Sequence, residues 1–272
     1  MLAACRFGCL GERVGYYGNS LGDHFGVGHI FLAGEAPGLF YGYVTQGIVQ
    51  KEDITENGIK YIKQDGSVGY YQTVNKTTPV AGDVKYVDRN GDGVVDDNDR
   101  DIIGNPNPDF TYGFQTKVSW KSLSLSASFN GVQGRDILNV GNRYNNTPGT
   151  KSNNVTRKAF QNMWTDENPS NLYPKSTFVV QNMVMDRYVE DGSYLRCSDI
   201  TLSYVLPAKW TNKIGIKNTS VYASVKNAFV ITDYSGYDPE VNSFAFDGLR
   251  PGVDMNSYPT PRSFVFGLNL TF

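Results

Sequence analysis

The feature that most constrains this chain is a set of stretches in which apolar and polar residues alternate. At the C-terminus, RSFVFGLNLTF has an apolar residue at every second position. Successive side chains of a β-strand point to opposite faces, so the pattern predicts a strand with one apolar face. The apolar positions are Phe264, Phe266, Leu268, Leu270 and Phe272.

The same alternation occurs in four earlier stretches. One runs from Phe110 to Trp120, and after a tight turn at Lys121–Ser122 it repeats from Leu123 to Phe129. Two more rows are Ile200, Leu202, Tyr204, Leu206 and Val221, Ala223, Val225. These predicted strands reach about ten residues, the length that a tilted strand needs to cross a bilayer.

Alternation by itself fits a β-sandwich as well as a membrane barrel. Three details favour the barrel. The polar face carries small residues suited to a wet lumen, aromatic residues gather toward strand ends, and short connections alternate with long ones. The long connections run from Gln133 to Tyr194 and from Thr232 to Pro261. The sequence therefore predicts an all-β fold built from antiparallel transmembrane strands.

Short sequence motifs give little sign of chemistry. A net charge of -2 offers no basic field for nucleic acid, and HExxH and Walker motifs are missing from the sequence. The acids Asp166, Glu167, Asp238 and Glu240 stand beside or near prolines, so we interpret them as loop residues. In the first long connection, TRKAFQNMW predicts a short helix with Ala159, Phe160, Met163 and Trp164 on its apolar side. We predict no enzyme activity and no catalytic residue.

The stretch DRNGDGVVDDND has the spacing of a calcium loop, which needs oxygen ligands at positions 1, 3, 5, 7, 9 and 12 and glycine at position 6. Its last ligand is an aspartate where a sensor has glutamate, and its flanks read as strand and turn, not paired helices. Two alternatives remain: a structural Ca²⁺ site, or an Asx- and Gly-rich turn without metal. The candidate ligands are Asp88, Asn90, Asp92, Val94 (through its carbonyl), Asp96 and Asp99.

From about Gly34 to Phe272 the chain resembles the C-terminal part of SusC/RagA-family TonB-dependent outer-membrane transporters. The segments that carry the resemblance occur in the family's order: GEAPGLFYGYVTQGI, GDVKYVDRNGDGVVDDNDRDIIGNPNPDFTYGF, MWTDENPSNLYPK, DRYVEDGSYLRCSDITLSYVLP, NAFVITDYSGYDPEVN and RSFVFGLNLTF. The resemblance implies that residues 16–272 are the C-terminal segment of a large antiparallel barrel with long extracellular loops. Residues 1–15 are unassigned, and the plug domain is expected to be absent.

The resemblance also implies a place and partners. We expect the outer membrane of a Gram-negative, Bacteroidetes-like cell, and import of a glycan or peptide with a SusD-like lipoprotein. TonB with ExbB and ExbD would drive the complete transporter, and this chain, as a fragment, is not expected to transport alone. The alternation that ends at Phe272 resembles the signal for the barrel-assembly machinery. Two alternatives are a self-standing small barrel or porin, and a secreted calcium-stabilised glycan-binding β-domain.

Overall fold

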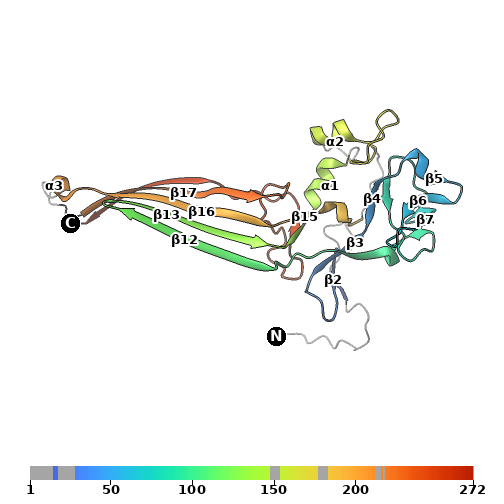
Figure 1. Ribbon diagram of the computed structural model, residues 1–272, viewed down its shortest axis with the longest axis horizontal. Coiled ribbons are helices and arrows are strands. Elements are labelled where there is room, and N and C mark those ends of the chain that lie inside the picture. Colours follow the sequence, from blue (N-terminus) through green and yellow to red (C-terminus); the bar gives the residue numbers. More distant parts are fainter. Residues whose placement is uncertain are drawn as a thin grey trace. The chain divides into compact units, whose positions relative to one another are not determined.

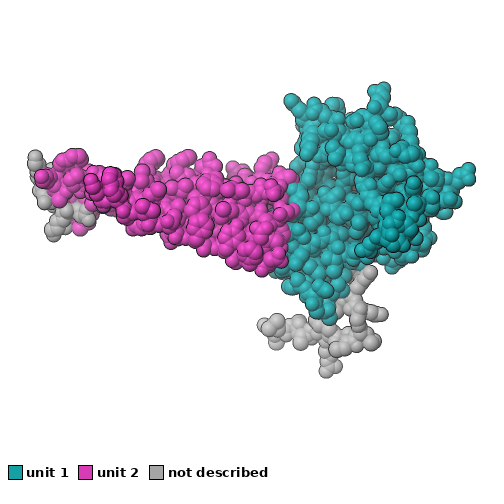
Figure 2. Space-filling view, in the orientation of Figure 1, with its two compact units in different colours: residues 1–107, 136–190, 242–256 teal, residues 108–135, 191–241, 257–272 magenta. Residues whose placement is uncertain are grey.

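A computed structural model describes residues 15–17, 28–147, 154–176, 183–211, 216 and 218–271. They form two compact units, coloured separately in Figure 2. Unit 1 comprises residues 1–107, 136–190 and 242–256, and unit 2 comprises residues 108–135, 191–241 and 257–272. Among the described residues, no helix is both long enough and apolar enough to cross a membrane. Residues 1–14 of the unassigned N-terminal stretch lie outside the described residues.

Unit 2 is built on a five-stranded antiparallel sheet, in which each strand is hydrogen-bonded to its neighbours in the order β12-β13-β16-β17-β19. Figure 1 shows β12, β13, β16 and β17 side by side. The bounds are β12 (Phe110–Trp120), β13 (Leu123–Gln133), β16 (Tyr194–Val205), β17 (Asn218–Thr232) and β19 (Ser263–Thr271), with α3 (Ala208–Thr211) between β16 and β17. The predicted strands are confirmed, as are the ends of both long connections.

The register of this sheet gathers the apolar residues on one face. Phe114 lies opposite Phe129, and Leu125 lies opposite both Val118 and Leu202. The β12–β13 turn closes at Lys121, whose φ of 54° is in the left-handed region that tight hairpins use. The pairing shifts beside Ser128 on β13 and between Cys197 and Asp199 on β16, yet the apolar residues stay on one face.

Unit 1 consists of short sheets and short helices. One sheet has four strands, β1 (Gly15–Tyr17), β2 (His29–Phe31), β3 (Leu39–Tyr43) and β11 (Arg100–Gly104). Two sheets have three strands each: β5 (Ile54–Thr55), β6 (Gly58–Ile62) and β7 (Val68–Tyr71) form one, and β14 (Asp136–Asn139), β15 (Val189–Asp191) and β18 (Val253–Asp254) form the other. Two sheets have two strands each: β4 (Thr45–Ile48) with β9 (Val84–Tyr86), and β8 (Thr73–Val74) with β10 (Val94–Val95). Its helices are α1 (Val140–Asn146) and α2 (Arg157–Asn162), with 3-10 turns η1 (Lys51–Asp53), η2 (Asp97–Asp99) and η3 (Asp186–Tyr188).

The core of unit 1 is rich in tyrosine. Phe40, Tyr43 and Tyr86 are at most 1% exposed and pack in one buried cluster. Buried tyrosine hydroxyls need hydrogen-bond partners. The Tyr61 hydroxyl donates to the Asp88 carbonyl at 2.6 Å, and the Tyr71 hydroxyl accepts from the Tyr86 amide at 3.2 Å. Burial raises the pKa of Tyr61 to about 12, so this hydroxyl stays protonated at neutral pH.

Candidate functional site: a two-faced sheet and an acidic loop

The apolar face of the unit 2 sheet is open. Trp120 is 68% exposed, Val118 64% and Phe266 80%, although soluble monomers rarely expose large contiguous apolar patches. The face is large because every strand contributes to it. Its exposed members include Phe110, Tyr112, Phe114, Val118, Trp120, Leu123, Leu125, Leu202, Tyr204, Val221, Phe229, Ile231, Phe264, Phe266, Leu268 and Leu270. Such a face suits contact with hydrocarbon.

The opposite face of the sheet is polar and internally hydrogen-bonded. The hydroxyls of Ser119 and Ser124 lie 2.8 Å apart across β12 and β13. Asp199 accepts hydrogen bonds from Thr201 at 2.8 Å and Ser224 at 2.7 Å, and it pairs with Lys226 at 3.0 Å. Small hydroxyl side chains and a charge pair are typical of a wall that faces water inside a barrel.

A buried ion cluster fastens a loop to this polar face. Arg196 on β16 contacts Asp238 at 2.5 Å and Glu240 at 3.2 Å, and its side chain is only 6% exposed. Glu240 also accepts hydrogen bonds from the Tyr194 hydroxyl at 2.7 Å and the Asn130 amide at 3.0 Å. The segment 238–240 is thereby held against β13 and β16.

Asp238 stays ionised in this cluster. Burial opposes its charge, but hydrogen bonds from Thr260 and the Glu240 backbone, together with the positive charge of Arg196, lower the pKa of the carboxyl. The sequence reading of Asp238 and Glu240 as loop residues missed this role. The sequence offered no local signal for it: period two puts residue 196 in phase with the apolar row that begins at Ile200, and the register shift between Cys197 and Asp199 brings Arg196 to the polar face.

The acidic loop of unit 1 is closed by its own side chains. Asp88, 2% exposed, accepts from the amides of Gly91 at 2.6 Å and Gly93 at 2.8 Å. Both glycines have positive φ, 76° and 87°, which lets the chain turn around the Asp88 carboxylate. Asp99, fully buried, accepts from the amides of Arg89 at 2.8 Å, Asn90 at 3.2 Å and Asp96 at 2.8 Å.

The remaining candidate side-chain ligands, those of Asn90, Asp92 and Asp96, are also engaged within the loop. Asp92 accepts from the Val94 amide at 2.9 Å and the Asn90 side chain at 3.0 Å. Asp96 caps η2 by accepting from the Asn98 amide at 2.8 Å. Within the described ranges, no group of three or more His, Cys, Asp or Glu side chains is placed to hold a metal ion. This geometry fits the metal-free turn, and calcium binding stays a prediction.

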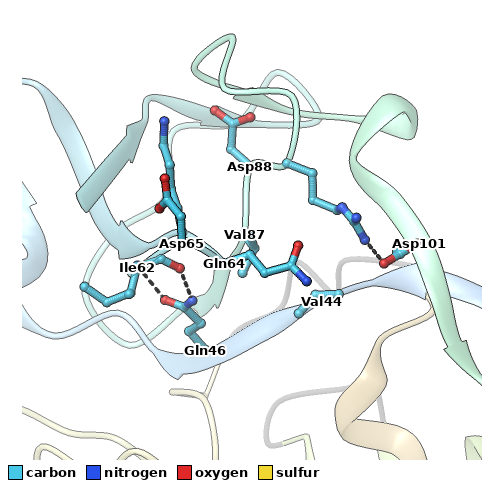
Figure 3. A pocket seen from close by; sticks show the side chains of 10 residues that line it. Val44, Gln46, Ile62, Gln64, Asp65, Val87, Asp88 and Asp101 are labelled. Atoms are coloured by element: carbon cyan, nitrogen blue, oxygen red, sulfur yellow. Dashed lines mark hydrogen bonds and ion pairs between the residues drawn. The ribbon is translucent and has the colours of Figure 1, made fainter. Parts of the chain in front are cut away.

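A hollow of about 480 Å³ lies beside the acidic loop (Figure 3). Arg89 on its wall forms an ion pair with Asp101. The Gln46 side chain donates a hydrogen bond to the Ile62 carbonyl and accepts one from the Ile62 amide. Its lining has no Ser, Cys or His that could act as a nucleophile, and its charges are of both signs. The hollow can accept a polar group.

The C-terminal pattern is a strand, as predicted. Phe264, Phe266, Leu268 and Leu270 lie on the exposed apolar face of β19, between 43% and 80% exposed. Phe272 lies outside the described residues. The recognition of this strand by an assembly machinery stays a prediction.

Comparisons with known proteins identify relatives of this chain. No protein-family model matches it. A TonB-dependent receptor of Formosa agariphila is 35% identical over 201 residues, 71% of this chain and 20% of that protein. The TonB-dependent receptor SusC of Bacteroides thetaiotaomicron is 34% identical over 194 residues, 69% of this chain and 17% of that protein. The chain thus spans about a fifth of the length of these curated relatives.

Solved structures agree with these relatives. The structure of the RagAB peptide transporter matches with a TM-score of 0.63 and 25% identity, covering 90% of this chain and 24% of that chain. The RagAB peptide importer in its open-open state matches with a TM-score of 0.61 and 26% identity, covering 90% and 23%. The chain therefore belongs to the SusC/RagA family of TonB-dependent receptors, and its five-stranded antiparallel sheet is a segment of the family's β-barrel.

Proposed function

We propose that this chain forms the C-terminal part of the barrel of a TonB-dependent importer that takes up a glycan or peptide with a SusD-like lipoprotein. The observation that carries the proposal is the two-faced sheet, with its open apolar face and hydroxyl-lined polar face. The apolar face would contact lipid and the polar face would line the passage. The RagAB peptide importer supports a peptide as cargo, and the similarity to SusC and RagAB supports a SusD-like partner.

The edges of the sheet support a place within a larger barrel. Among the described residues, β12 and β19 each pair with a single neighbour, so each leaves one edge of its backbone open. Long open edges are templates for further strand pairing. Strands from the rest of the importer would cover them. Open edges weigh against a self-standing small barrel, and the exposed apolar face weighs against a secreted soluble domain.

The other expected partners follow from the proposed role. In the complete importer, TonB with ExbB and ExbD would act on the plug domain. The barrel-assembly machinery would read the apolar face of β19 together with Phe272. We expect the outer membrane of a Bacteroidetes-like Gram-negative cell. The chain alone should lack TonB-dependent uptake, and observing such uptake would contradict its role as a fragment.

The proposal is tested by measuring which face meets lipid. Spin labels are attached to Leu202→Cys and to its neighbour Ser203→Cys, in a background without the three native cysteines, and the chain is reconstituted in phospholipid vesicles. We expect the label at 202 to be accessible to oxygen dissolved in the bilayer and the label at 203 to an aqueous nickel complex. Equal aqueous accessibility at both positions would overturn the proposal.

Calcium at the acidic loop is a separate proposal with a structural role only. It rests on the ligand spacing from Asp88 to Asp99, with hard oxygen ligands that suit Ca²⁺. The test compares the melting temperature of the chain in saturating CaCl₂ and in EDTA. A saturable rise with calcium that is lost in Asp92→Asn would support the site, and equal melting temperatures would support the metal-free turn.

A further inference from the structure

A second hollow in unit 1 has a cationic, amide-rich lining. It has a volume of about 230 Å³, and its lining includes Asn142, Asn146, Thr147, Lys158, Tyr173 and Arg187. Pockets that bury a drug-sized ligand measure about 300–1,000 Å³. This smaller hollow suits one sugar or one amino-acid residue. None of its lining residues is an aspartate or glutamate.

The two cations of this hollow lack acidic partners. Neither Arg187 nor Lys158 forms an ion pair with a described residue. Arg187 Nη2 donates to the Leu172 carbonyl at 2.5 Å, whereas its Nη1 is buried and has no hydrogen-bond partner among the described residues. The first hollow differs, because its Arg89 is paired with Asp101.

Arg187 thus lines the hollow with a positive charge that no described acidic side chain pairs, and the acceptor that best fits a guanidinium group is a carboxylate. The second hollow also supplies fixed polar groups beside Arg187. The Asn142 amide donates to Glu190 at 2.9 Å, and the Asn146 carbonyl oxygen accepts from the Thr156 hydroxyl at 2.6 Å. Side chains that are already held in place lose little freedom when a ligand binds.

We propose that the second hollow binds the carboxylate of one acidic residue at the end of a glycan or peptide. Arg187 anchors the carboxylate, Lys158 adds positive charge, and the two asparagines contact neighbouring hydroxyl or amide groups of the ligand. The inference rests on the proposed function, because it narrows the glycan or peptide cargo to one that carries a carboxylate. Ligand binding in this hollow of unit 1 can be measured whether or not unit 2 is inserted in lipid.

The test is calorimetric titration of the full chain in detergent micelles with sodium glucuronate, triglycine or glucose. We expect binding of an acid and no binding of glucose. Arg187→Gln should weaken binding about 10- to 100-fold, the range for hydrogen bonds to charged groups. Lys158→Gln should weaken it less, with an effect that shrinks in high salt. Arg157→Gln, which removes the adjacent positive charge but does not line the hollow, serves as the matched control and should bind normally.

The outcomes separate cleanly. Binding of glucuronate alone assigns a uronate-bearing glycan, and binding of triglycine alone assigns a peptide carboxylate. Equal binding of glucose, no binding of either acid, or full affinity in both Arg187→Gln and Lys158→Gln would overturn the inference. Near-ultraviolet circular dichroism checks the fold of each variant, and if Arg187→Gln is misfolded the exposed Lys158 variant decides. A negative result here leaves the spin-label pattern of unit 2 unaffected, so failure of this inference can be distinguished from failure of the proposed function.

Discussion

The two units of this molecule differ in the exposure of strands with similar alternating sequences. Unit 1 buries one face of such a strand, whereas unit 2 leaves both faces exposed. In unit 1, β7 alternates, and its Gly69 and Tyr71 are buried while Val68 and Tyr70 are exposed. In unit 2, β12 alternates equally well, yet all of its residues are exposed. Alternation therefore identifies which side chains share a face, but it does not say what covers that face. The following experiments probe the surroundings of buried and exposed groups in both units.

The largest effect is expected where unit 2 buries charge. Arg196→Met would leave Asp238 ionised and 9% exposed without its partner, and breaking a buried pair in this way costs about 3–5 kcal/mol. The measurement is the free energy of unfolding in detergent micelles. Lys226→Met is the matched control, because Lys226 pairs with Asp199 but is 55% exposed, and exposed pairs contribute about 1 kcal/mol or less. Equal losses in both variants would contradict the buried cluster.

The next effect tests the environment of the apolar face. Leu125→Arg places a charge opposite Val118 and Leu202, and at the middle of a bilayer such a change costs about 2–4 kcal/mol. Ser126→Arg is the control on the next residue, because its side chain points to the polar face. The measurement is the unfolding free energy of the chain in phospholipid vesicles. If both arginines were tolerated equally, the apolar face would not lie in lipid.

Sequence predicted unit 2 far better than unit 1, and the reason is distance along the chain. The alternation of β12, β13 and β19 lies within single short stretches, so their apolar face could be named directly. The core of unit 1 joins residues such as Leu138 and Val253, which pair across β14 and β18 and have no local pattern in common. The division into two units was likewise not predicted.

The site residues divide in the same way. The turn around Asp88 follows from local Asx and Gly residues, whereas the contact of Arg196 with Asp238 joins a strand to a distant loop. The predicted short helix is confirmed as α2, with Thr156 accepting from the Ala159 amide at 3.1 Å. The prediction that Phe160 belongs to the apolar side of this helix was wrong, because Phe160 is 63% exposed. Ala159 is fully buried, and a helix of six residues presents too few turns to define a face.

A smaller effect is expected in the acidic loop. Asp99→Ala removes the acceptor for the amides of Arg89, Asn90 and Asp96 inside unit 1. Leaving buried donors unsatisfied costs about 1–3 kcal/mol, which should appear in the unfolding free energy in EDTA. Asp92→Ala also removes an acceptor, but on an exposed residue where water takes its place, so its cost should be about 0.5 kcal/mol or less. A ranking of the two in the reverse order would show that Asp99 does not hold the loop.

The smallest effect distinguishes the buried interior of unit 1 from the open sheet by pH. His29 is 1% exposed, and its Nε2 lies 3.1 Å from the Pro251 carbonyl oxygen. Burial lowers the pKa of His29 below 6.5, and the positive charge of Arg250 lowers it further. The Pro251 carbonyl and the charge of Asp247 raise it, but they do not cancel the lowering.

The unfolded histidine therefore takes up a proton near pH 6.5, before the folded one does, so this contribution to stability is complete above pH 6.5 and is lost as the pH falls toward the folded pKa. Between pH 7 and 5.5 the unfolding free energy should fall by less than about 1.4 kcal/mol per pH unit, the limit for one proton. His29→Gln should flatten this slope. If the slope survives in His29→Gln, the interior around His29 is open to water and the contrast between the two units is weaker than their exposed fractions indicate.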